Sequence, residues 1–301
     1  MYAIETEALT HRFGSAEPVL RDLALQVPTG GIYGFLGPNG AGKTTTLRLI
    51  LGLLPRQRGR ISVLSESLDA NRLSLLRRIG SSIESPSVYA HLTARENLRV
   101  WQLVFQCPAS RVEAVLAQVG LGDTGGKPAG QFSLGMKQRL SIAVALLHEP
   151  SMLILDEPTN GLDPQGIIDI RELLTDLNRN LGTTIIVSSH LLAEVERLVT
   201  HVGIINLGQL VFQGPLEALV ARQDQMSSTR FDSDDNARAL EVIRNGGWVA
   251  HLEANKVVVP GLPPAEIGRI NHALCQAGLS VHEITRAGTD LESIFIDLIK
   301  A

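Results

Sequence analysis

Nine residues near the start of the chain, GPNGAGKTT, have the composition of a loop that binds phosphate. They fit the pattern G-x-x-x-x-G-K-[ST] and lie between an apolar run typical of a strand and a run typical of a helix. Glycines let the backbone curl so that successive N–H groups point at phosphate oxygens, and the positive end of the following helix adds to the attraction. Lys43 can then reach the outer phosphates of a nucleotide, and the Thr44 hydroxyl can bind Mg²⁺. The predicted loop comprises Gly37, Pro38, Asn39, Gly40, Ala41, Gly42, Lys43, Thr44 and Thr45.

Two adjacent acids, Asp156 and Glu157, follow the apolar run MLIL much later in the chain. Carboxylates behind a buried run are costly to desolvate, so a counter-charge is expected opposite them. Mg²⁺ with its phosphates can supply that charge, and Asp156 is predicted to hold the ion through its coordination shell. Glu157 points elsewhere from the strand end and is predicted to polarise the attacking water as general base. Two adjacent acids are therefore expected, one to hold the metal ion and one to act as the base.

The segment FSLGMKQRLSIAVALLHEPSMLILDEPTNGLD resembles the ABC ATPases, the nucleotide-binding subunits of ABC transporters. The family signature has the form L-S-G-G-Q; Ser133 and Gly135 match it, whereas Leu134 and Met136 depart from it. The resemblance implies that Ser133 and the amides that begin its helix cover the γ-phosphate of an ATP held by the other subunit, so that a homodimer encloses two ATP molecules. Asp163 matches the family's D-loop, which communicates across that dimer.

Three further positions can be compared with the family one at a time, and one of them departs from it. His190, at the end of TTIIVSSH, resembles the switch histidine that contacts the γ-phosphate, and it follows a strand at the edge where α/β sheets bind ligands. Phe13 occupies the place of the aromatic residue that stacks on adenine; packing on a strand is the alternative. Glu84 replaces the glutamine that approaches Mg²⁺, and the alternative is a loop acid that faces solvent. This replacement, followed by SPSVY, resembles the branch of bacitracin-resistance and lantibiotic-immunity exporters.

The apolar pattern predicts the elements that position these residues. Short β-rich runs alternate with helical patterns, and continuous apolar strands indicate a parallel sheet covered by helices. The expected fold class is α/β: a P-loop NTPase core of ABC type over residues 1–222, with a helical insert over about 90–148. That insert begins with a capping box, Thr93 and Glu96. A polar stretch then precedes a small α+β accessory domain over 228–301, in which no chemical constellation is found.

Composition excludes several classes of protein. The chain has 301 residues, of which 44% are apolar and 19% charged, as expected of a globular protein and not of a disordered one. A net charge of −4 gives no sign of a nucleic-acid partner. The two cysteines, Cys107 and Cys275, form no zinc or redox motif and suit a reducing compartment. No apolar run reaches the length of a membrane span, and no signal peptide is recognisable.

The sequence therefore predicts an ATPase that uses ATP and Mg²⁺ and lies peripherally on the cytoplasmic face of the cell membrane. It would drive transmembrane permease subunits encoded separately and export a hydrophobic or peptide-like antibiotic. One alternative is a soluble ABC-type ATPase that acts on ribosomes or DNA, although the chain has a single P-loop and no sustained heptads. Another is a regulator that binds ATP without turnover, against which Lys43, Asp156, Glu157 and His190 argue.

Overall fold

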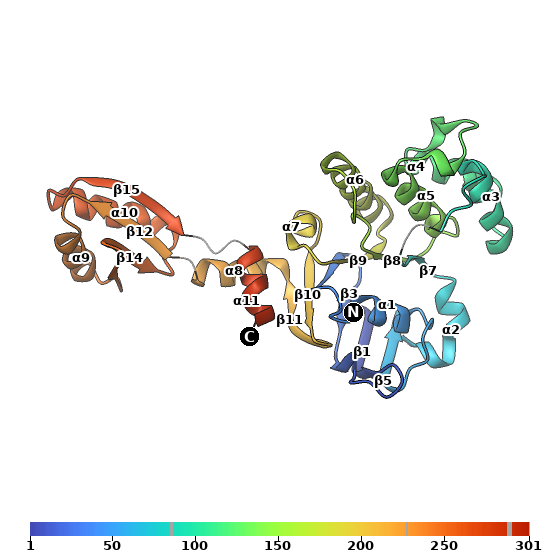
Figure 1. Cartoon of the computed structure of the whole chain (residues 1–301), viewed down its shortest axis with the longest axis horizontal. Coiled ribbons are helices and arrows are strands. Elements are labelled where there is room, and N and C mark those ends of the chain that lie inside the picture. The colour runs from blue at the N-terminus through green and yellow to red at the C-terminus, as the bar shows by residue number, and fades with distance from the viewer. Residues whose placement is uncertain (85–86, 227, 288–290, 301) are drawn as a thin grey trace. The chain divides into compact units, whose positions relative to one another are not determined.

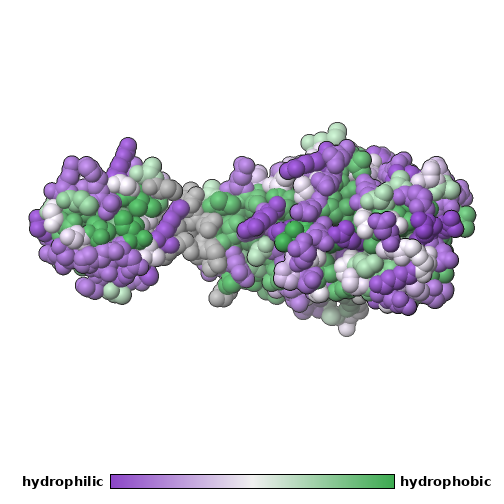
Figure 2. Space-filling model, turned by 90° about the horizontal axis from the view of Figure 1, so that it is seen from above, coloured by the Kyte–Doolittle hydropathy of each residue, from purple (hydrophilic) through white to green (hydrophobic). Residues whose placement is uncertain are grey.

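The computed structural model describes residues 1–84, 87–226, 228–287 and 291–300. The chain divides into two compact units, Met1–Leu216 and Glu217–Ala301 (Figure 1). Hydrophilic side chains cover much of the visible face of each unit in Figure 2, with apolar areas between them. Within the described residues, no helix combines the length and the apolar character needed to cross a membrane. The mixed α/β content agrees with the predicted fold class.

A six-stranded sheet in the order β11-β10-β4-β9-β8-β7 forms the centre of the first unit. Its strands are β4 (Ile32–Leu36), β7 (Ile79–Ser82), β8 (Met152–Asp156), β9 (Thr184–Ser189), β10 (His201–Asn206) and β11 (Gln209–Pro215). Five strands run parallel, and only β11 pairs antiparallel, with β10. Every residue of β4, β8 and β9 is buried, as the continuous apolar runs predict. Because the strands are parallel, the ends of β4, β8 and β9 meet at one edge, where Leu36 pairs with Ser189 and Asp156 with Ser188.

Three helices of the first unit pack on these central strands. α1 contacts β8, and α6 and α7 contact β9. Their bounds are α1 (Lys43–Ile50), α6 (Pro164–Leu181) and α7 (Leu192–Val195). Each of the three begins shortly after a strand end at the shared edge, so the loops before them carry the residues that the sequence singles out.

A second, antiparallel sheet in the first unit was not predicted. Its path is β2-β1-β5-β6, and β3 also pairs with β1. The strands are β1 (Tyr2–His11), β2 (Leu20–Leu23), β3 (Gln26–Pro28), β5 (Arg58–Val63) and β6 (Glu66–Ser67). One core cluster contains Ile4 and Val63 of this sheet together with Ile154 of β8. A polar link also joins the two sheets, because Gln213 Oε1 accepts hydrogen bonds from the Tyr33 hydroxyl at 3.2 Å and the Gln26 N–H at 2.7 Å.

Helices make up most of the segment between β6 and β8. They are α2 (Leu68–Leu76), α3 (Ala94–Phe105), α4 (Ser110–Gln118) and α5 (Leu134–Leu146), with 3-10 turns at Gly122–Thr124 and Ala129–Gln131. α3, α4 and α5 contact one another and lie together in Figure 1. The capping box of α3 is confirmed, since the Thr93 side chain accepts from the Glu96 N–H and the Glu96 carboxylate accepts the Thr93 N–H at 2.8 Å.

The second unit contains a β-α-β-β-α-β arrangement, the split βαβ pattern of ferredoxin-like folds. Its elements are β12 (Ser228–Ser233), α9 (Asn236–Asn245), β13 (His251–Glu253), β14 (Lys256–Pro260), α10 (Pro264–Gln276) and β15 (Val281–Ala287); α8 (Leu216–Met226) precedes them and α11 (Leu291–Lys300) follows. The sheet order is β13-β14-β12-β15, and all pairs are antiparallel. Phe231 of β12, Ile243 of α9 and Ile270 of α10 belong to one buried core.

Candidate nucleotide site

The loop between β4 and α1 has a backbone that requires glycine. Gly40 and Gly42 have φ values of 81° and 110°, in the left-handed region that other residues rarely adopt. A Cβ atom on Gly37 would lie 2.3 Å from the Ile205 carbonyl oxygen. α1 begins at Lys43 with no side-chain cap and no acid in its first turn. Its first N–H groups thus lack the side-chain acceptor that usually caps a helix, which is the condition for an anion site at a helix N-terminus.

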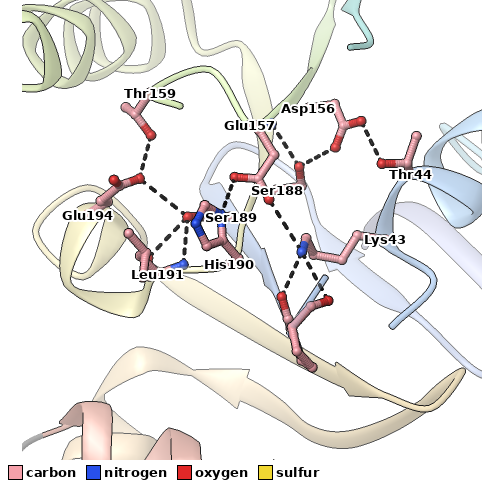
Figure 3. A network of polar contacts seen from close by, with 12 residues as sticks. Lys43, Thr44, Asp156, Glu157, Thr159, Ser188, Ser189, His190, Leu191 and Glu194 are labelled. Carbon is pink, nitrogen blue, oxygen red and sulfur yellow. Dashed lines mark hydrogen bonds and ion pairs between the residues drawn. The ribbon is translucent and has the colours of Figure 1, made fainter. Parts of the chain in front are cut away.

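Glu157 lies between a cation and an imidazole. Lys43 is 6% exposed, and its Nζ donates to the Gly37 carbonyl at 2.6 Å. The same Nζ lies 3.3 Å from Glu157 Oε1, and His190 Nδ1 lies 2.9 Å from Glu157 Oε2 (Figure 3). Glu157 also has a φ of 49°, a left-handed conformation that non-glycine residues adopt at a cost. Both carboxylate oxygens are therefore oriented by side chains from other elements.

Asp156 and Thr44 place two oxygen groups of the kind that Mg²⁺ prefers side by side. The Thr44 hydroxyl donates to Asp156 Oδ2 at 2.8 Å, and Asp156 is 4% exposed. Among the described residues no group of three or more His, Cys, Asp or Glu side chains could hold a metal by itself. Nucleotide-bound Mg²⁺ needs no such cluster, because water and phosphate oxygens complete its octahedron beside one or two protein ligands. The pair therefore fits Mg²⁺.

The motif-based prediction missed four side chains of this network. Ser188 is fully buried; its hydroxyl donates to Asp156 Oδ1 and accepts the Glu157 N–H at 2.9 Å. Thr159, Ser189 and Glu194 form a second group beside His190 (Figure 3). Their position in the sequence was the available signal, because Ser188 and Ser189 precede His190 directly and Thr159 follows Glu157 by two residues.

Ser133 and Asp163 both cap helices. Ser133 is the N-cap of α5 and accepts the Met136 N–H at 3.2 Å. Asp163 is the N-cap of α6 and accepts the Gly166 N–H at 2.9 Å. The two caps line one groove of about 600 Å³, and Gly135 also lines it. The structure thus brings the signature segment and the predicted D-loop residue to a common surface.

Phe13 and Glu84 lie outside the network of Figure 3. Phe13 follows the end of β1, is 47% exposed, and meets the ring of buried His11 edge-on at 4.9 Å between centroids. Glu84 has a φ of 65° and a carboxylate side chain that is 60% exposed. Its ion pair is with Arg48, in the last turn of α1. The metal-ligand role of Glu84 stays a prediction.

Comparison with known proteins shows the family to which the chain belongs. The ABC transporter family model matches residues 20–160. The chain is 42% identical over 299 residues to the bacitracin transport ATP-binding protein BcrA of Bacillus licheniformis, covering 98% of this chain and 97% of that protein. It is 42% identical over 195 residues to the lantibiotic transport ATP-binding protein SrtF of Streptococcus pyogenes, covering 65% of this chain and 83% of that protein.

Solved structures agree with the sequence matches. The structure of cbiO1 from Clostridium perfringens, described as part of the ABC transporter complex cbiONQ, has a TM-score of 0.68 and is 29% identical, covering 73% of this chain and 91% of that chain. A further ATP-binding subunit of an ABC transporter has a TM-score of 0.64 at 31% identity, covering 73% of this chain and 92% of that chain. The chain belongs to the family of ABC transporter ATP-binding proteins and is an ATP-hydrolysing subunit of such a transporter.

Proposed function

We propose that this subunit powers the export of a peptide antibiotic of the bacitracin or lantibiotic kind. It would act as a homodimer on the cytoplasmic face of the membrane, bound to permease subunits encoded separately. The export assignment is supported by similarity to a bacitracin transport ATP-binding protein along 98% of this chain, which includes the second unit. The observation that carries the hydrolytic mechanism is the contact of Glu157 with both Lys43 and His190.

Each side chain at the strand ends has one task in this mechanism. The amides that begin α1 and the Lys43 ammonium bind the phosphates of ATP. Glu157 takes a proton from the attacking water, and a positioned base of this kind contributes about 10²–10⁴-fold to a rate. His190 holds the second oxygen of Glu157 and orients the carboxylate. Because a carboxylate accepts hydrogen bonds, the Nδ1 of His190 carries the hydrogen in this contact.

Thr44 and Asp156 would hold Mg²⁺, which supplies positive charge against the phosphates when it is bound. We include Glu84 as a third oxygen ligand, as its place in the sequence suggests. To serve in this role its carboxylate must leave its ion pair with Arg48 and bind the metal ion instead. Activity of a Glu84→Gln variant should then need a higher Mg²⁺ concentration for half-maximal rate, and superimposable titration curves would leave Glu84 as a loop acid paired with Arg48.

The remaining predicted residues serve binding and assembly in this proposal. The exposed ring of Phe13 would stack on adenine. The groove beside Ser133, Gly135 and Asp163 would receive the nucleotide held by the second subunit, with the positive N-terminal end of α5 directed at the γ-phosphate. Two nucleotides would thus be enclosed by two copies of the chain.

A second groove, of about 390 Å³, is the proposed contact for the permease. It lies among β7, α3 and α5 and is lined by a row of rings: Trp101 and Phe105 are 5.8 Å apart between centroids, and Phe105 and His148 are 4.4 Å apart. Burial lowers the pKa of His148, so its imidazole is neutral near pH 7. Such an apolar surface suits a short apolar segment of a membrane protein.

A Glu157→Gln variant tests the hydrolytic assignment. The amide keeps the shape of the side chain and cannot take a proton, so we expect ATP binding to persist while turnover falls by about 100-fold or more. Gel filtration with ATP and Mg²⁺ should show an accumulated dimer. A Lys43→Ala variant is the matched control and should lose ATP binding. Native turnover in Glu157→Gln, or a monomer under saturating ATP, would contradict the proposal.

A survival assay tests the export assignment. Cells that carry this chain with its permease subunits should tolerate a bacitracin- or lantibiotic-type peptide, and the same cells with Glu157→Gln should lose that tolerance. Equal sensitivity of both strains would contradict export and leave the ATPase assignment intact.

A further inference from the structure

We propose that Glu194 is a positioning residue that holds the Glu157–His190 pair in its reactive arrangement. The inference deepens the proposed mechanism and rests on it. Glu194 belongs to the short helix α7, Leu192–Val195, which begins two residues after His190. Its carboxylate connects that helix to the loop that carries Glu157.

The connection is a short hydrogen bond to a buried hydroxyl. The Thr159 hydroxyl donates to Glu194 Oε2 at 2.7 Å, and Thr159 is only 2% exposed. The same Glu194 oxygen lies 3.5 Å from the hydroxyl of Ser189, the residue before His190 (Figure 3). Thr159 follows Glu157 by two residues, and Glu194 follows His190 by four. The Thr159–Glu194 hydrogen bond therefore links the chain just after Glu157 to the chain just after His190.

The backbone hydrogen bonds of the sheet do not reach Glu157 and His190. β8 and β9 are hydrogen-bonded neighbours as far as the register of Asp156 with Ser188. Glu157 and His190 lie beyond that register, on the loops that leave the two strands. Glu157 also has a left-handed backbone, which persists only where surrounding contacts impose it. Ser188 imposes one contact from the strand side through the Glu157 N–H, and the Asn160 N–H donates to the Glu157 carbonyl at 3.1 Å. The Thr159–Glu194 bond adds a contact from the loop side.

Loss of the Glu194 carboxylate should therefore act on turnover and not on ATP affinity. The phosphate-binding residues lie on β4, α1 and the loop between them, and none of them contacts Glu194 or Thr159 among the interactions of the described residues. Without the bond, the two loops lose one of their links beyond the sheet, and the 2.9 Å contact of His190 with Glu157 is held less firmly. A misplaced base lowers the rate without changing the binding of the ground state.

The test uses two pairs of variants in the full chain. Glu194→Ala removes the acceptor and Glu194→Gln keeps a carbonyl oxygen in its place; Thr159→Val removes the donor and Thr159→Ser keeps it. We expect Glu194→Ala and Thr159→Val each to lower kcat by about tenfold, the scale of one hydrogen bond, with KM within about twofold of native. Glu194→Gln and Thr159→Ser should recover most of the rate. Glu196→Ala is the control: it also removes a glutamate carboxylate, two residues after Glu194, and it should leave kcat unchanged.

A double variant separates positioning from general destabilisation. If the two groups act through one bond, Glu194→Ala combined with Thr159→Val should lower kcat no further than either change alone. Native kcat in Thr159→Val, a parallel rise of KM, or additive losses would overturn the inference, even if Glu194→Ala did not fold. Native turnover in Glu157→Gln would overturn the proposed mechanism itself. An inactive Glu157→Gln beside a native Thr159→Val would reject the role of Glu194 alone.

Discussion

A buried hydroxyl connects the two acids of the site at the level of single residues. Ser188 donates to Asp156 and accepts from the backbone of Glu157, so it orients the predicted metal ligand and the predicted base together. Ser188→Ala would leave one buried carboxylate oxygen and one N–H without their partner. Hydrogen bonds to charged groups contribute about 1.5–3 kcal/mol, so we expect kcat to fall by at least about tenfold.

ATP affinity of the Ser188→Ala variant should stay within about threefold of native, because Lys43 and the loop amides are untouched. Steady-state ATPase kinetics and nucleotide titration measure the two quantities. Ser81→Ala, at an exposed position of the edge strand β7 in the same sheet, is the matched control. A native rate in Ser188→Ala would show that the acids are held without this hydroxyl.

Residue types explain which parts of the site the sequence could predict. Lys43, Thr44, Asp156, Glu157 and His190 stand in patterns whose spacing and flanking strands are informative by themselves, and the structure brings these five together. Ser188, Thr159 and Glu194 are common residue types whose partners are far away in sequence, so their closeness to His190 or Glu157 in the chain was the only local signal. The pairing of Glu84 with Arg48 was not predicted either, because it depends on how a loop returns to a helix.

At the scale of elements, the hairpin between β13 and β14 offers a test of local backbone strain. Glu253 pairs with Lys256, so Ala254 and Asn255 form a two-residue turn, with φ values of 49° and 62°. Positive φ at both positions defines a type I′ turn, which favours Asn-Gly over Ala-Asn. Ala254→Asn should therefore stabilise the second unit. We expect its free energy of unfolding to rise by about 0.5 kcal/mol, and the midpoint of its thermal unfolding by about 2–4 °C.

Calorimetry of the full chain can follow this change in the transition of the second unit. Ala254→Val is the opposite control, because a β-branched residue tolerates positive φ least, and its midpoint should fall. A lower midpoint for Ala254→Asn would show that another contact of Ala254 outweighs the turn conformation.

The elements themselves were predicted where their pattern is local. The sequence predicts a small α+β domain over 228–301, and the structure has strands and helices over the described residues 228–287 and 291–300, where the apolar periodicity is local. The antiparallel sheet was missed because its strands are partly exposed and because α1 lies between β1 and β5 in the chain, so that their pairing is a long-range contact. Parallel strands buried on both faces were recognisable from composition alone.

At the scale of the whole molecule, the division into two units predicts that hydrolysis needs only the first. Every residue with a proposed chemical role lies within Met1–Leu216. A chain that ends at Met226 should fold and hydrolyse ATP with kcat within about twofold of the full chain, since it keeps the complete core around the site. The same truncation with Lys43→Ala should be inactive. A folded truncation without ATPase activity would assign the second unit a necessary part in turnover.

The side chain of Gln213 has a consequence for how the first unit opens. It accepts from Gln26 in the antiparallel sheet and from Tyr33 in the parallel sheet, where the two sheets also share an apolar core. Proteins open in cooperative groups of elements, and amide hydrogens exchange with solvent only when their group opens. The amide of Gln26 is a donor in this link, so it should exchange as slowly as the amides of β4. The sheet that the sequence did not reveal would then belong to the most protected part of the chain.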